Sequence, residues 1–121
     1  MNPYKQLSEL DMFAIFGIAA PCFEAFKKIA CAGCDGRVKT EQQDLLEAID
    51  TVERIIKDSE SDTIDVFLIK TDADIDRIMN RYIEVFGDNQ RMTAARLLLE
   101  FVATNNVERL ERCLTLLKKL V

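Results

Sequence analysis

Apolar residues recur at helical spacing along most of this chain of 121 residues, and few helix-breaking residues interrupt the pattern. Only two prolines and four glycines are present, which favours long unbroken helices. The clearest example spans about 41–57, where apolar side chains recur every three or four positions at Leu45, Ile49, Val52 and Ile56. The β-branched segment 63–70 is compatible with a strand, but a lone strand cannot satisfy its backbone and no partner strand is evident. We therefore predict a short buried helix there and an all-α fold.

Capping and turn residues divide the apolar pattern into separate helices. Thr40 and Gln43 form a capping box before the third helix, and Gly87 stands where a left-handed residue ends a helix. Asp88 or Asn89 is expected to cap the next helix, and Asn105-Asn106 separates the last two. The predicted helices cover about 7–20, 21–31, 41–57, 63–70, 71–86, 89–104 and 107–121. Their short links predict a compact bundle of six or seven helices, packed mostly antiparallel.

The length and composition indicate one globular domain over 1–121. Apolar residues make up 49% of the chain and charged residues 31%, which is typical of a folded domain that needs no disulfide or metal. The apolar stretch 12–20 is too short to span a bilayer and lacks a small-residue cleavage motif after it. We expect it to form a buried helix, and we expect a cytoplasmic protein with reduced cysteines.

The charge and the missing histidine narrow the classes of function. The formal net charge is −5, which disfavours nucleic acid and anionic membranes as partners. The chain has no histidine, so the commonest general base and the commonest metal ligand are both missing. The sequence shows no glycine-rich phosphate loop, nucleophile elbow or paired-carboxylate signature. These features predict a non-enzymatic protein without a cofactor.

The densest chemistry lies in residues 30–41, between two apolar helices. Cys31 and Cys34 form a Cys-x-x-Cys pair, which suggests a redox site, or a zinc site that would also use Cys22 and Cys113. The pair follows the end of a helix, where the dipole does not lower a thiol pKa, so we favour small buried thiols instead.

The Asp-Gly dipeptide in the same stretch allows two interpretations. Aligned with a calcium-binding EF-hand loop, only Asp35 falls at a ligand position, and Glu41 is displaced by one. The alternative is a corner between helices, in which Asp35-Gly36 reverses the chain and Val38 plugs the core. We favour the corner.

Residues 32–42 read AGCDGRVKTEQ. This stretch resembles the helix–turn–helix corner of tellurite-resistance TerB-like domains, whose pattern is Ala-x-x-Asp-Gly-x-Val-x-x-Glu-Glu. Gln42 departs from it by replacing the second acid. The resemblance implies an all-helical fold and a divalent-cation site, with Asp35 and Glu41 as the metal-facing residues.

Three hypotheses of function follow. The first is a protein–protein interaction module, an adaptor, inhibitor or regulator that is also a homo-oligomer and whose protein partner the sequence does not identify. Its contact surface would be an apolar seam on the last helix, formed by Val107, Leu110, Leu114 and Leu117. The second is a TerB-like divalent-cation sensor. The third is a cysteine-based zinc or redox module.

Overall fold

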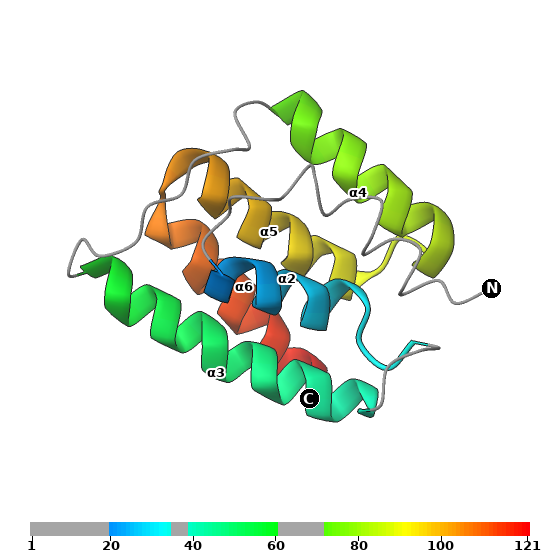
Figure 1. The fold of residues 1–121 in the computed structure, drawn as a ribbon, viewed down its shortest axis with the longest axis horizontal. Helices are drawn as coiled ribbons and strands as arrows, with labels where there is room; N and C mark the ends of the chain where they lie inside the picture. Colours follow the sequence, from blue (N-terminus) through cyan, green and yellow to red (C-terminus); the bar gives the residue numbers. More distant parts are fainter. Residues whose placement is uncertain (1–19, 35–38, 61–71) are drawn as a thin grey trace.

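The computed structural model describes residues 20–34, 39–60 and 72–121, and within these ranges it contains five α-helices and no strand. The helices are α2 (Ala20–Ala30), α3 (Glu41–Glu60), α4 (Asp72–Phe86), α5 (Gln90–Thr104) and α6 (Val107–Leu120), as drawn in Figure 1. The all-α prediction is confirmed for these residues. The helices predicted over 7–19 and 63–70 lie outside the described ranges, so the total of six or seven stays a prediction.

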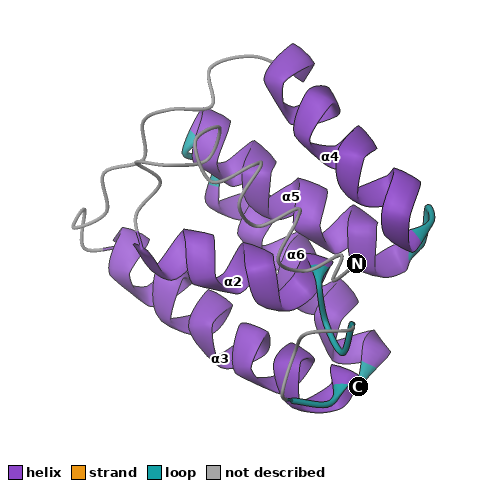
Figure 2. Cartoon of the chain, turned by 45° about the vertical axis from the view of Figure 1, so that its right-hand side comes forward, coloured by secondary structure: helices purple, strands orange, loops and turns teal. Residues whose placement is uncertain are grey.

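Four of the helices pack in a closed ring. α2 contacts α3, α3 contacts α6, α6 contacts α5, and α5 returns to α2. Neighbours in this ring run in opposite directions, which agrees with the predicted antiparallel packing (Figure 1). α4 lies outside the ring and packs along α5, which the rotated view also shows (Figure 2). The arrangement leaves α5 with neighbours on three sides.

The central position of α5 explains why eight of its 15 residues are buried. One side of α5 carries apolar residues at helical spacing, and all four of these are buried: Met92, Ala95, Leu99 and Val102. Four further side chains of α5 are buried as well: Ala94, Leu97, Leu98 and Phe101. A helix with neighbours on three sides keeps only a narrow polar side turned to solvent, where Thr93 is exposed.

Aromatic contacts attach α4 to the ring. The rings of Phe26 on α2 and Tyr82 on α4 meet edge to face, with centroids 5.2 Å apart and planes at 86°. Tyr82 also stacks on Phe86 at 6.5 Å. Edge-to-face and offset pairs of this kind add about 1 kcal/mol beyond the area that they bury. The Phe26–Tyr82 contact therefore fixes α4 against α2, and the Tyr82–Phe86 pair lies within α4 itself.

The predicted helix boundaries agree with the structure at three places and differ at the end of α3. The Thr40 hydroxyl accepts from the Gln43 amide at 3.2 Å, and the Gln43 side chain accepts from the Thr40 amide at 3.0 Å. Gly87 has a φ of 86° and donates its N–H to the Ile83 carbonyl at 2.8 Å. Asn89 caps α5 by accepting from the Met92 amide at 3.0 Å. α3 continues to Glu60, beyond the predicted end near residue 57.

Within residues 20–34, 39–60 and 72–121, no helix is both long and apolar enough to cross a membrane.

Candidate functional site

The turn between α2 and α3 is held by a buried acidic side chain. The Cys34 amide donates to the Cys31 carbonyl at 3.2 Å, which closes a tight turn, and Gly33 inside it has a φ of 66°. The Gly33 N–H donates to Oδ2 of Asp44 at 3.1 Å. Asp44 has no exposed surface, although it lies in the first turn of α3 among exposed neighbours. A buried carboxylate on α3 therefore holds the turn in place at the exposed Gly33.

Arg91 fastens the same corner from the side of α5. Its guanidinium donates to the carbonyl oxygens of Ala32 at 3.3 Å and Ala30 at 3.5 Å, at the C-terminal end of α2. It lies 3.5 Å from the carboxylate of Glu41 and stacks over the ring of Phe86 at 5.7 Å. A positive charge at a helix C-terminus satisfies carbonyls that have no partner inside the helix and complements the dipole. Arg91 thus joins four helices at one point.

Replacing Arg91 with methionine is expected to lower the free energy of unfolding by about 2 kcal/mol, because buried carbonyls lose charged donors. A lysine at this position should not restore stability, since one ammonium cannot reproduce a planar fork of donors. Arg54 provides the matched control, because its side chain is 77% exposed and its ion pair with Asp50 spans one helical turn. Urea unfolding should give a change within about 0.5 kcal/mol for Arg54→Met. Equal losses at the two sites would contradict the bridging role of Arg91.

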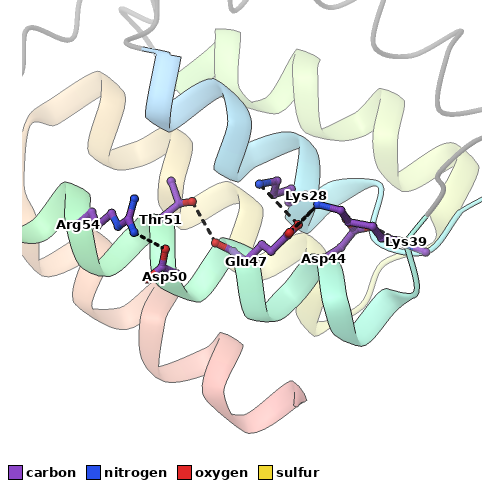
Figure 3. Close-up of polar contacts among 8 residues, drawn as sticks. Lys28, Lys39, Asp44, Glu47, Asp50, Thr51 and Arg54 are labelled. Carbon is purple, nitrogen blue, oxygen red and sulfur yellow. Dashed lines mark hydrogen bonds and ion pairs between the residues drawn. The ribbon is translucent and has the colours of Figure 1, made fainter.

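A second polar cluster lies near the start of α3, and Figure 3 draws it with its neighbours on the same helix. Glu47 accepts from the ammonium of Lys39 at 2.7 Å and lies 3.7 Å from the ammonium of Lys28 on α2. The hydrogen bond from Lys39, with the positive charge of both lysines, lowers the pKa of the Glu47 carboxyl below its usual value. All three side chains are at least partly exposed, so this cluster adds little stability.

The structure describes one of the two metal-facing residues implied by the TerB-like resemblance. Glu41 is exposed, and its carboxylate pairs with Arg91. Asp35 lies outside the described residues. Within the described ranges, no three histidine, cysteine, aspartate or glutamate side chains are grouped as metal ligands. A cation at Glu41 would have to compete with the Arg91 guanidinium, and the cation site stays a prediction.

The four cysteines all lie in the described ranges, and no disulfide joins them. Cys22, Cys31 and Cys113 are buried, and Cys34 is partly exposed. Burial raises the pKa of the Cys22 and Cys113 thiols to about 12. At such a pKa almost no thiolate exists near neutral pH, so these two side chains act as small apolar groups.

Native alkylation is expected to separate the thiols into classes. With iodoacetamide at about pH 8, Cys34 should react first, because it alone is partly exposed. Cys22 and Cys113 should react only after unfolding, since a thiol of pKa about 12 is roughly one ten-thousandth ionised at that pH. Peptide mass spectrometry over time measures the order. Cys34→Ser should remove the fast phase, and fast labelling of Cys113 would disprove this assignment.

The seam predicted on the last helix lies mostly inside the protein. Leu110 and Leu117 have no exposed surface, and Val107 and Leu114 are partly buried and pack against the core. Regular three-four spacing marks an apolar face, but it does not distinguish a face turned toward the chain's own core from one turned toward a partner. The involvement of these four residues in partner binding stays a prediction.

The outer surface of α6 instead forms one side of an open groove with α5. The groove has a volume of about 320 Å³. Leu97 and Leu116 supply its apolar part. Around them lie threonine and charged side chains: Thr93, Glu108, Glu111, Arg112, Thr115 and Lys119. Sequence analysis missed this surface, because exposed charges on a helix carry no signal of what they face.

Comparison with known proteins gives no match for this sequence or fold: no protein-family model matches, and no curated protein or solved structure matches significantly.

Proposed function

We propose that this protein is a non-enzymatic, cytoplasmic protein–protein interaction module, an adaptor, inhibitor or regulator, that self-associates and binds through the α5–α6 groove. The observation that carries the proposal is the groove itself, with an apolar floor at Leu97 and Leu116 and charged side chains around it. An apolar centre with a polar rim is the usual arrangement of a protein interface.

The charges around the groove support this assignment. Glu108, Glu111, Arg112 and Lys119 are exposed, and none forms an ion pair within the part of the chain that the structure describes. Other charges on α6 are satisfied internally, since Arg109 pairs with Glu100 and Lys118 approaches Glu53. Unsatisfied charges of both signs beside apolar surface can select a partner by complementarity.

Site-specific photo-crosslinking in the native host tests the proposal. A photoreactive amino acid in place of Thr93 should give discrete crosslinked bands, because Thr93 lines the groove. The same amino acid in place of Asn80, which is exposed on α4, should give none. Mass spectrometry of the bands then identifies the partner. Bands from both positions, or from neither, would contradict binding through the groove.

A further inference from the structure

The exposed stripe of α6 along the groove has a symmetric spacing. Glu108, Arg112, Thr115 and Lys119 follow one another at intervals of four, three and four residues. Positions at such intervals lie on one face of an α-helix. The order of intervals is the same in both directions, so an antiparallel copy of the helix can place each position opposite another member of the stripe.

The charges along this stripe are complementary to themselves. Two antiparallel copies of α6 can be related by a two-fold axis that passes between residues 113 and 114. Glu108 of one copy then faces Lys119 of the other, and Arg112 faces Thr115. Each pairing occurs twice because of the symmetry. A parallel arrangement would instead bring Glu108 against Glu108 and Lys119 against Lys119. The charge pattern therefore selects the antiparallel orientation.

We propose that the occupant of the α5–α6 groove is a second copy of this chain, docked antiparallel through α6. This inference rests on the proposed function and names its partner. The four groove charges contain two acids and two bases, so the surface is neutral and offers nothing to a strongly acidic or basic partner. It matches its own copy, and Leu97 and Leu116 lie beside the stripe to supply apolar contact.

Charge reversal tests the proposal, because mixing two oppositely reversed variants should restore association. Variants that were merely destabilised would not be rescued in this way. Glu108→Lys places two lysines opposite each other in the homodimer, and Lys119→Glu places two glutamates there. Each single variant should self-associate about tenfold more weakly than the wild type. Mixed in equal amounts, the two variants should form a heterodimer, because both Glu–Lys contacts are then restored with their signs exchanged.

Sedimentation velocity at about 100 µM, where weak protein association is measurable, gives the readout. The wild type and the equimolar mixture should both approach twice the chain mass of 13.8 kDa. The control Glu84→Lys changes an exposed charge on α4 and should leave association unchanged. Circular dichroism verifies that each variant is folded. A monomeric wild type, unaffected single variants, or a mixture that stays monomeric would each overturn the proposal.

The crosslinking experiment distinguishes failure of the homodimer proposal from failure of the proposed interaction function. If the chain is monomeric and Thr93 crosslinks to a different protein, the groove binds a partner but not a second copy. If the chain is monomeric and Thr93 crosslinks to nothing, both the homodimer proposal and the proposed interaction function fail. A crosslink between two copies through Thr93 supports both.

Discussion

Replacing Gly33 with alanine is expected to lower the free energy of unfolding by about 3 kcal/mol. A Cβ at this position would lie 2.7 Å from the backbone nitrogen of Glu41 and 2.8 Å from its Cβ, both well inside contact distance. The neighbouring atoms belong to the first residue of α3 and cannot turn away. The φ of 66° adds about 1 kcal/mol for any residue with a side chain, and the clash adds a further 1–3 kcal/mol.

Gly87 provides the matched control for this substitution. Its φ of 86° imposes a similar backbone cost, but a Cβ there would meet nothing within 4 Å. Gly87→Ala should therefore cost only about 1 kcal/mol, and the difference between the two variants measures the clash alone. Chemical denaturation of both variants gives the comparison. Equal losses would show that backbone strain, rather than contact with α3, makes Gly33 necessary.

Much of the helical architecture could be predicted from the sequence, because it is encoded locally. The capping box at Thr40 and Gln43 and the left-handed Gly87 are interactions within a few residues, and both are confirmed. Spacing also identified the core side of α3, where Leu45, Ile49 and Val52 are buried. Local sequence patterns of this kind predict where a helix begins, where it ends and which of its faces is apolar.

The contacts that fasten the corner could not be predicted, because they join residues far apart in the chain. The Gly33–Asp44 hydrogen bond spans 11 residues, and Arg91 reaches the Ala30 carbonyl across 61. In the sequence, Asp44 resembles any acid in a first helical turn, a common position that complements the dipole. Its complete burial depends on how α3 packs in the folded protein, which the sequence around it does not show.

The candidate binding surface on α5 and α6 could not be predicted from the sequence either. The apolar spacing on α6 pointed to Leu110 and Leu117, and both lie inside the protein. The charged side chains of the groove read as an ordinary solvated helix face. What distinguishes them is that Arg109 and Lys118 approach acids on other helices, whereas Arg112 and Lys119 do not within the described residues. Such a difference depends on tertiary structure.

Asp44→Ala is expected to destabilise the protein by about 3 kcal/mol, through a local and identifiable change. The substitution removes the buried carboxylate that accepts the Gly33 N–H, and a hydrogen bond to a charged group contributes about 1.5–3 kcal/mol. The space left by the carboxyl group adds a cavity cost. Asp44→Asn keeps the shape and an acceptor oxygen, so it should lose about half as much. Asp50→Ala serves as the control on α3, because Asp50 is exposed and, among the described residues, pairs only with Arg54 one turn away.

Amide hydrogen exchange distinguishes this mechanism from a general loss of stability. In Asp44→Ala, protection of the Gly33 amide should fall further than protection of the amides in α5, because the turn opens without unfolding the ring. In Asp50→Ala, both should stay near their wild-type values. If the Gly33 amide keeps its protection in Asp44→Ala, the hydrogen bond between them does not hold the turn. The corner would then depend on Arg91 and on the close approach of Gly33 to Glu41.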